Sequence, residues 1–353
     1  MTKALVLLSG GLDSTLAARI LLDQGVEVTG LSFKSSFFDA EKAKKAALQL
    51  GIKLVEIDFS AEHLDMVKNP AHGYGKNMNP CIDCHGLMLK KAKEIMKNPP
   101  APFDKGGQYD FVATGEVLGQ RPMSQNREAL EIVEKISGLE GKLVRPMSAK
   151  LLNESEPEKQ GKIIRGKLLD IRGRSRQRQL GLVKKYGIKE FASPGGGCLL
   201  TDPEFSEKLL KILEYWPNCD NNDIELLKCG RVLWLKDKKD KNILLIIGRD
   251  EKDNQNLEKL AGAGDMIMQL ADENGPTSLL RGTKHTRPNA LGGRGVSSIM
   301  EREIQAPEEL NMSKLKLGEK KSQEEIIELA TMLTGYYATK ARGKKVKMEI
   351  RGV

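Results

Sequence analysis

The sequence predicts an α/β fold, a doubly wound parallel sheet, followed by a smaller α+β domain. In the first half of the 353 residues, short apolar runs alternate with segments whose apolar side chains recur at helical spacing. Strands that alternate with helices run parallel, because each helix carries the chain back to the same edge of the sheet. After Pro203 an amphipathic helix precedes two apolar runs joined by a charged turn, which is typical of an antiparallel pair.

The elements of the first domain follow one another closely. They are predicted as a strand at 4–8, a helix at 14–24, a strand at 26–33, a helix at 40–50, a strand at 53–58 and a strand at 111–113. Gly25 and Gly51 stand where two of these helices end, a common position for glycine. Two stretches rich in Gly, Asn or Pro, 68–80 and 98–107, are predicted to be irregular loops.

The second domain is predicted to begin near residues 202–204, which gives domains 1–203 and 204–353. This division agrees with the usual domain size of about 150 residues. The predicted elements of the second domain are a helix at 205–215, strands at 231–235 and 243–248, a helix at 324–338 and a basic tail at 340–351.

The composition limits the class of protein. Lysine and arginine outnumber the acidic residues by 57 to 48, a net charge of +9. No apolar run approaches the roughly 20 residues that span a bilayer, and no export signal is visible. The five cysteines are an odd number and include one Cys-x-x-Cys. We therefore expect a cytoplasmic protein without a membrane partner, whose thiols serve metal, cluster or redox chemistry instead of disulfides.

A candidate phosphate loop directly follows the first strand and opens the first helix. Gly10 and Gly11 allow backbone conformations in which successive N–H groups point at one anion, and the helix N-terminus adds partial positive charge. Ser9 and Ser14 can donate hydroxyl hydrogen bonds, and Asp13 is placed to hold Mg²⁺ against the phosphates. Because the loop lacks the Gly-Lys-Ser/Thr ending of a Walker loop, transfer of a γ-phosphate is not the expected chemistry.

These residues match the SGGxD[ST] signature of the PP-loop ATP pyrophosphatases, so the first domain resembles this family and its adenine nucleotide alpha hydrolase-like fold. Members of the family adenylate an oxygen of their substrate and release pyrophosphate. The resemblance implies that ATP is bound here, with its adenine beside Phe33 at the end of the second strand. Phe33 alone is equally compatible with a place in the core.

Three cysteines form a second candidate site. Cys81 and Cys84 precede a predicted helix, where a thiolate is favoured, and Cys198 follows four consecutive residues of Pro and Gly. Three thiolates can hold three irons of a [4Fe–4S] cluster and leave the fourth iron open. A persulfide cysteine with a resolving partner is a second interpretation. Structural zinc is a third and needs one more ligand, available from His85, Cys219 or Cys229.

The cysteine pattern makes the resemblance more specific. An Asn-Pro-Cys-x-x-Cys sequence with a later Gly-Cys198 looks like the tRNA 2-thiouridylases, which carry a persulfide pair or a three-cysteine cluster in these regions. Residues 113–120, which include Thr114 and Gly115, are similar to the ATP-site segment of tRNA 4-thiouridine synthetases. The resemblance implies a catalytic role for the three cysteines. Asp83 between the paired cysteines is a candidate proton shuttle or replacement ligand.

Two basic segments are candidate RNA contacts. The first has four arginines at alternate positions: Arg172, Arg174, Arg176 and Arg178. Arginine suits contact with phosphate, although a charged surface helix is the simpler interpretation. From about residue 243 onward the chain is also similar to the RNA-binding domain of NFACT proteins. Its basic candidates are Lys340, Arg342, Lys344 and Lys345. His63, His72 and His285 are predicted to be surface or structural residues.

The residues and the resemblance together predict an ATP-dependent tRNA uridine thiolase. ATP adenylates the uridine carbonyl oxygen, and sulfur carried at the cysteines displaces AMP. The expected partners are tRNA and a sulfur donor, either sulfide or a persulfide derived from a cysteine desulfurase. 4-Thiouridine at position 8 is favoured over 2-thiouridine at position 34. The alternatives are a PP-loop enzyme that inserts nitrogen into or amidates a small molecule, and an RNA-binding quality-control factor.

Overall fold

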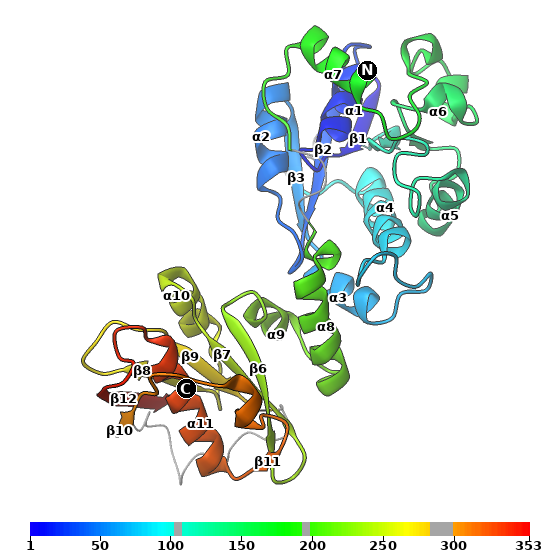
Figure 1. The fold of residues 1–353 in the computed structure, drawn as a ribbon. Coiled ribbons are helices and arrows are strands. Elements are labelled where there is room, and N and C mark those ends of the chain that lie inside the picture. Colours follow the sequence, from blue (N-terminus) through cyan, green and yellow to red (C-terminus); the bar gives the residue numbers. More distant parts are fainter. Residues whose placement is uncertain (102–107, 193–197, 283–298) are drawn as a thin grey trace. The chain divides into compact units, whose positions relative to one another are not determined.

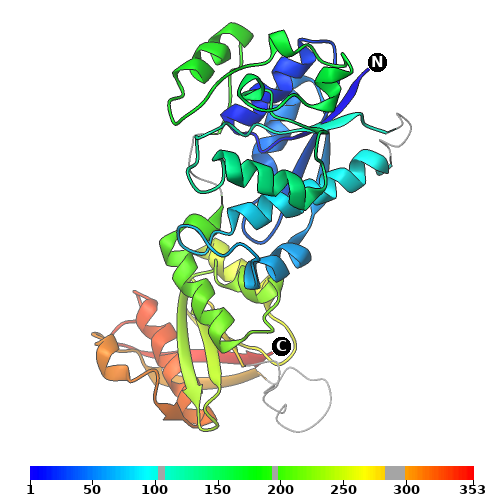
Figure 2. The same cartoon turned by 90° about the vertical axis from the view of Figure 1, so that its right-hand side faces the viewer.

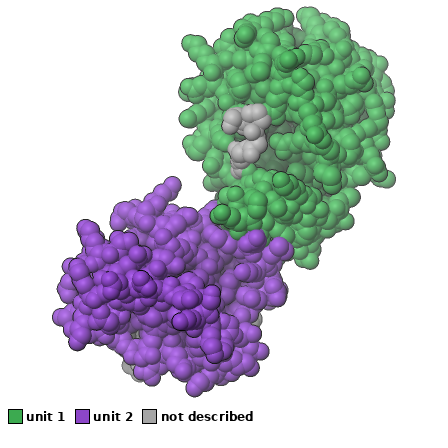
Figure 3. Space-filling view, viewed as in Figure 1, with its two compact units in different colours: residues 1–206 green, residues 207–353 purple. Residues whose placement is uncertain are grey.

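A computed structural model describes residues 1–101, 108–192, 198–282 and 299–353 (Figure 1). The chain forms two compact units, residues 1–206 and 207–353 (Figure 3). The division falls inside helix α8 (Pro203–Tyr215), whose first residue directly precedes the position where the sequence suggests the second domain begins.

Unit 1 is built on a five-stranded parallel sheet, which confirms the predicted fold class (Figures 1 and 2). The strand order is β3-β2-β1-β4-β5, and all neighbours run parallel. The strands are β1 (Lys3–Leu7), β2 (Glu27–Lys34), β3 (Lys53–Asp58), β4 (Phe111–Ala113) and β5 (Leu143–Val144). β2 and β3 lie on one side of β1, and β4 and β5 lie on the other, so the direction in which the chain adds strands reverses at β1. Ligands of such sheets bind at this switch point, outside the carboxyl ends of the strands.

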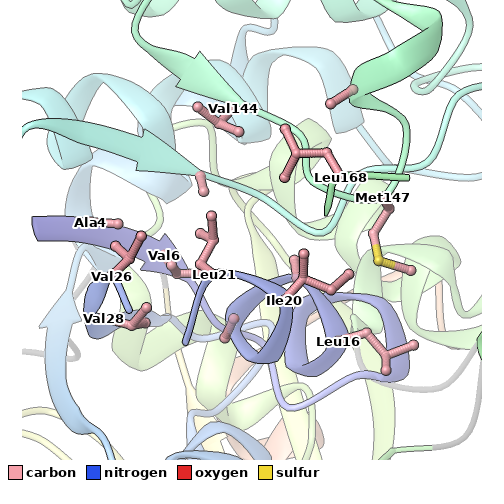
Figure 4. Packing of buried hydrophobic residues seen from close by; sticks show 14 of the residues in the cluster. Ala4, Val6, Leu16, Ile20, Leu21, Val26, Val28, Val144, Met147 and Leu168 are labelled. Atoms are coloured by element: carbon pink, nitrogen blue, oxygen red, sulfur yellow. The ribbon is translucent and has the colours of Figure 1, made fainter. Parts of the chain in front are cut away.

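Helices cover both faces of this sheet because alternate strand residues point to opposite sides. Ala4 and Val6 of β1 pack with Leu16 and Ile20 of α1 in one apolar cluster (Figure 4), to which α7 also contributes. Leu5 packs into the other cluster with α4 and α5. The helices of the unit are α1 (Leu12–Leu22), α2 (Glu41–Leu50), α3 (Ser60–Lys68), α4 (Cys81–Lys97), α5 (Arg127–Ser137), α6 (Glu156–Lys159) and α7 (Gln177–Tyr186).

Unit 2 contains a seven-stranded, mixed sheet in the order β10-β12-β8-β9-β7-β6-β11, which confirms the predicted α+β class. The strands are β6 (Arg231–Asp237), β7 (Asn242–Ile247), β8 (Met266–Leu270), β9 (Ser278–Arg281), β10 (Ile299–Gln305), β11 (Lys320–Lys321) and β12 (Lys345–Gly352). β6 and β7 pair antiparallel, as the charged turn between them predicts. Its further helices are α9 (Asn221–Leu226), α10 (Glu251–Leu260) and α11 (Gln323–Tyr337).

The predicted basic tail is wrong as a structural assignment, since most of it is strand β12. This strand pairs antiparallel with β10 on one side and β8 on the other. Val346, Met348 and Ile350 are buried, and Lys345 and Lys347 on either side of Val346 are exposed. The lysines are therefore the solvent side of a half-buried strand. Among the described helices, none is long and apolar enough to cross a membrane.

Candidate nucleotide and thiol site

The phosphate loop has the tight geometry that its glycines suggest. Gly10 has a φ of +72°, and a Cβ there would lie 2.2 Å from the carbonyl oxygen of Lys42. Only glycine fits both the conformation and the space. Gly11 is the N-cap of α1, and no side chain caps this end within the described chain. The first N–H groups of α1 are thus left for a ligand, which is the arrangement that binds phosphate.

The two serines of the loop bond to the loop itself. The Ser14 hydroxyl donates to the Gly11 carbonyl oxygen over 3.0 Å and accepts from the Ser9 N–H over 3.3 Å. In this state the two residues shape the loop, and their predicted contact with phosphate stays a prediction. Ser9 is exposed and Ser14 is buried.

The segment after β4 packs against the start of α1. A Cβ on Gly115 would lie 2.4 Å from the Ser14 backbone nitrogen, so glycine permits this close approach. The Thr114 side chain turns to the protein interior and donates to Glu116 Oε2 over 3.0 Å. Thr114 and Gly115 thus border the phosphate loop, in keeping with their prediction as residues of the nucleotide site.

Asp13 is oriented by an amide side chain. Gln120 Nε2 donates to Asp13 Oδ2 over 2.6 Å. The other oxygen, Oδ1, is buried and has no hydrogen-bond partner among the described residues. An unpaired carboxylate oxygen beside a phosphate loop fits Mg²⁺, which prefers oxygen ligands.

Phe33 lies in the core of unit 1. Its side chain is 5% exposed, and its ring centroid lies 5.0 Å from that of Phe59. This is the core position that the sequence left open. The contact of Phe33 with adenine stays a prediction.

The paired cysteines occupy the first turn of α4, as predicted. Cys81 is the first residue of the helix and is half-buried, and Cys84 is buried. The Cys84 Sγ lies 3.4 Å from His63 Nε2, and His63 Nδ1 lies 3.0 Å from the Ser35 hydroxyl. The His63 ring stacks on Phe59 with centroids 4.7 Å apart. The sequence did not associate His63 with the thiols. His63 is completely buried, and its ring contacts the rings of Phe37, Phe38 and Phe59.

The expectation that both paired thiols favour the thiolate is wrong for Cys84. Burial raises the pKa of Cys84 well above its usual value, and negative charge on Cys198 or Cys81 raises it further. Burial also raises the pKa of Cys198 to about 11. Desolvation therefore outweighs the helix N-terminus at Cys84. The same interactions show that the three cysteines lie within electrostatic reach of one another.

The three thiols do not form a ready metal site in this structure. Within the described residues, no group of three or more His, Cys, Asp or Glu side chains is arranged to hold a metal ion. Cys84 faces His63, and the Cys81 thiol donates to Asn79 Oδ1 over 3.1 Å. The placement of the thiols thus does not support the [4Fe–4S] cluster, or zinc in its place, predicted at Cys81, Cys84 and Cys198.

Asp83 has both carboxylate oxygens occupied. His72 donates its backbone N–H to Oδ2 over 2.9 Å, and its ring Nδ1 lies 2.8 Å from Oδ1. These contacts fix the loop before α4 to the first turn of the helix. The predicted roles of Asp83 as proton shuttle or replacement ligand stay predictions.

A buried ionic network joins the nucleotide segment to the cysteine helix. Glu116 lies 2.9 Å from His85 Nδ1 and 2.9 Å from Arg145 Nε, and Arg145 in turn pairs with Glu134 over 2.8 Å. Burial raises the pKa of Glu116, but the charges of Arg145 and His85 outweigh it and lower that pKa to about 2. Sequence reasoning missed this network because its members are far apart along the chain.

The alternating arginines lie beside the loop that contains Gln120, the partner of Asp13. The Gly173 N–H donates to the Leu118 carbonyl oxygen over 2.8 Å, which places the segment next to the loop of Gln120. Arg178 pairs with Asp170 over 2.5 Å. In the described chain the other three have no carboxylate partner; two are exposed, Arg172 and Arg174, and Arg176 is half-buried.

The basic candidates of unit 2 are exposed: Lys340, Arg342, Lys344 and Lys345. The Arg342 guanidinium lies over the Tyr336 ring, 4.5 Å from its centroid. The two lysines at 344 and 345 lead into β12 and form no ion pair within the described residues.

Comparisons with known proteins assign each unit to a class. Residues 1–150 match the family model of the thiamine biosynthesis protein (ThiI), and residues 230–332 match that of the NFACT protein RNA binding domain. The chain therefore combines a region similar to ThiI, of the PP-loop, tRNA-thiouridylase-like class, with a region similar to the NFACT-type RNA-binding domain.

Individual relatives match the first part of the chain. The tRNA-specific 2-thiouridylase MnmA of Treponema denticola is 38% identical over 138 residues, which cover 33% of this chain and 36% of the relative. The tRNA-specific 2-thiouridylase MnmA of Sulfurimonas denitrificans is 36% identical over 130 residues, which cover 33% of this chain and 35% of the relative. The chain thus spans about a third of the length of the curated relatives it matches. A crystal structure of a 4-thiouridine synthetase–RNA complex with bound ATP aligns with a TM-score of 0.38 and 20% identity, covering 64% of this chain and 52% of that one.

Proposed function

We propose that the protein is an ATP-dependent tRNA sulfurtransferase that thiolates a uridine. One observation carries the proposal: a single short segment touches both the nucleotide loop and the cysteine helix. Gly115 packs against Ser14 at the start of α1, and Glu116, the next residue, bonds to His85 beside Cys84. A base activated at the first site is thereby next to sulfur held at the second.

The first step is adenylation. The N–H groups at the start of α1 hold the phosphates of ATP, and the uridine carbonyl oxygen attacks the α-phosphorus so that pyrophosphate leaves. Asp13, whose Oδ1 is unpaired among the described residues, would hold Mg²⁺, and the ion would supply positive charge to the phosphate oxygens. The adenylated oxygen then becomes a good leaving group, which a pyrimidine carbonyl oxygen otherwise is not.

The second step transfers sulfur from the three-cysteine site. The terminal sulfur of a cysteine persulfide attacks the activated carbon, and AMP leaves with the former carbonyl oxygen. A second cysteine thiolate attacks the sulfur of the carrier cysteine, which releases the thiouridine and forms a disulfide. An external thiol reduces that disulfide before the next cycle. The buried thiols of Cys84 and Cys198 require substrate binding or local opening to reach the thiolate, since desolvation raises both pKa values.

The substrate is proposed to be tRNA, with position 8 favoured over position 34. The resemblance of residues 113–120 to the ATP-site segment of 4-thiouridine synthetases supports this choice. The arginine segment beside Gln120 supports RNA at the mouth of the site, and the NFACT-type unit supports a second contact. The outer sulfur of the cysteine persulfide comes from a desulfurase-derived persulfide, which already holds its sulfur at the required oxidation level. Sulfide, the other predicted donor, belongs to the cluster route, because a thiol takes up sulfide as a persulfide only with a two-electron oxidant.

The test is an anaerobic reaction of the full chain with ATP, Mg²⁺, a sulfur donor and unmodified tRNA, followed by digestion and mass spectrometry. We expect a thiouridine that is lost in Cys198→Ser and kept in the matched variant Cys229→Ser, whose thiol lies in unit 2. Chromatography separates the 2-thio from the 4-thio isomer. Pyrophosphate release and tRNA binding without any thiouridine would contradict the proposal and point to nitrogen insertion or amidation.

The same assay decides how the sulfur is carried. Iron-free protein and protein reconstituted with iron and sulfide are compared with a persulfide as donor. Product from the iron-free protein supports the thiol route. Product that forms only after reconstitution would contradict the thiol route and support sulfur transfer from a cluster at Cys81, Cys84 and Cys198.

A further inference from the structure

Two glutamines connect the arginine segment to the acid of the phosphate loop. Gln120 Nε2 donates to Asp13 Oδ2 over 2.6 Å, and Gln179 Nε2 donates to Gln120 Oε1 over 3.2 Å. A carboxylate can only accept hydrogen bonds, so Gln120 must present its NH₂ group to Asp13. Its carbonyl oxygen then faces Gln179, which sets the orientation of both amides.

These three residues, Gln179, Gln120 and Asp13, are called the relay. Burial and backbone hydrogen bonds hold the relay in place. Gln179 is completely buried in the first turn of α7, directly after the arginine segment. The backbone of that segment is bonded to the loop of Gln120, through the Gly173 N–H and the Leu118 carbonyl oxygen. A ligand that moves or fixes the arginine segment therefore acts on Gln179 and, through Gln120, on the carboxylate.

Asp13, the last member of the relay, has one carboxylate oxygen without a partner among the described residues. Asp13 Oδ1 is buried and unpaired among the described residues, while Oδ2 is held by Gln120. The amide thus fixes one oxygen and leaves the other unpaired, in a position to accept a cation. Groups that orient a metal ligand in this way typically contribute 10- to 100-fold to metal affinity.

We propose that Gln120 and Gln179 are positioning residues that couple RNA bound at the arginine segment to Mg²⁺–ATP bound at Asp13. The inference rests on the proposed function and adds a control to it, because Mg²⁺–ATP is then bound more tightly when RNA is present. Coupling between two sites is reciprocal, so Mg²⁺–ATP must tighten RNA binding by the factor by which RNA tightens Mg²⁺–ATP binding.

The first experiment measures the metal without RNA. Mn²⁺ binding to the full chain is followed by electron paramagnetic resonance in the presence of an ATP analogue that cannot be cleaved between the α- and β-phosphates. We expect Gln120→Met to weaken Mn²⁺ about 10-fold or more. Gln177→Met, the same change at an exposed position of α7, should leave the affinity as in the wild type. Unchanged affinity in Gln120→Met would overturn the role of Gln120.

The second experiment measures the coupling. The Kd of unmodified tRNA is determined with and without Mg²⁺ and the analogue for the wild type, Gln179→Met and Gln177→Met. We expect a wild-type ratio of about 5-fold or more, a ratio near one in Gln179→Met, and the wild-type ratio in Gln177→Met. Methionine keeps the length of glutamine and removes its amide, and circular dichroism verifies that each variant is folded.

The outcomes separate this inference from the function. A wild type that thiolates tRNA but shows a coupling ratio of one overturns the relay and leaves the function standing. The same holds if Gln179→Met retains the wild-type ratio. A wild type that neither binds nor thiolates tRNA overturns both the function and the coupling.

Discussion

At the scale of single residues, the phosphate loop allows the sharpest test because one backbone position fixes it. Gly10→Ala places a Cβ 2.2 Å from the Lys42 carbonyl oxygen at a φ of +72°. Gly25→Ala is the matched control, since its φ is +78° but nothing lies within 4 Å of its Cβ. Both variants suffer the conformational cost of about 1 kcal/mol, and only Gly10→Ala must displace backbone.

We therefore expect Gly25→Ala to bind ATP as the wild type does, with slightly lower stability. Gly10→Ala should lose ATP binding at least 100-fold and be the less stable of the two. Isothermal titration with Mg²⁺–ATP and thermal unfolding provide the two measurements. Wild-type ATP affinity in Gly10→Ala would show that the phosphates bind elsewhere.

Glu116 gives a prediction about pH. Although burial raises its pKa, Arg145 and His85 lower that pKa in the folded protein from 4.5 to about 2. A depressed folded pKa contributes stability above the unfolded pKa, and this contribution is lost as pH falls towards the folded value. The free energy of unfolding should thus decrease between about pH 4.5 and pH 2.

Glu116→Gln removes this group from the titration. The variant should be about 3–5 kcal/mol less stable at pH 7, because Arg145 loses a buried partner. Its free energy of unfolding should also depend less on pH below 4.5. Urea unfolding of both proteins at several pH values measures this. Equal slopes of stability against pH would contradict the buried ion pair.

The sequence predicted single residues well only where their chemistry is local. Gly10, Gly11 and Asp13 follow one another after a strand, so their geometry was readable from spacing alone. Cys84 meets His63 across 21 positions and His85 meets Glu116 across 31, and no periodicity links them. Burial then reversed the expected thiolate character of Cys84, because desolvation depends on packing that spacing does not reveal.

At the scale of elements, the misread C-terminal segment shows how charge can hide a strand. Val346, Met348 and Ile350 alternate with Lys345 and Lys347, which is the period of a half-buried strand. The density of lysine favoured the interpretation as a tail. In contrast, strands β1 and β4 were predicted from continuous apolar runs, which are typical of strands that are covered on both faces.

The arginine segment carries the prediction at this scale. Changing Arg172, Arg174 and Arg176 to Gln removes three charges without a carboxylate partner, whereas Arg178→Gln breaks an ion pair with Asp170. Each lost phosphate contact lowers the slope of log K against log salt concentration by about 0.9 for a duplex. We expect the triple variant to lower the slope by about 2.7, three contacts at about 0.9 each, and Arg178→Gln to change it little. Filter binding of tRNA between about 50 and 300 mM salt measures both slopes. An unchanged slope in the triple variant would mean that the three arginines form a charged surface and do not contact tRNA.

At the scale of the whole molecule, chemistry and RNA affinity can be separated because the chain consists of two compact units. The phosphate loop and the three candidate cysteines, Cys81, Cys84 and Cys198, belong to unit 1, and the exposed Lys344 and Lys345 belong to unit 2. The double variant Lys344→Gln/Lys345→Gln should raise the KM for tRNA and leave kcat unchanged, since it removes binding that is equal in the ground and transition states.

The matched control for this prediction is Lys238→Gln/Lys239→Gln, which removes two exposed lysines from the turn between β6 and β7 of the same unit. Both double variants lower the net charge of +9 by the same amount, so any long-range effect of charge is shared. A larger rise in KM for the variant at 344 and 345 therefore measures local contact between β12 and tRNA. Equal rises in both variants would mean that unit 2 attracts tRNA only through its overall charge. A fall in kcat in the variant at 344 and 345 would mean that its contacts with tRNA form in the transition state and take part in placing the uridine.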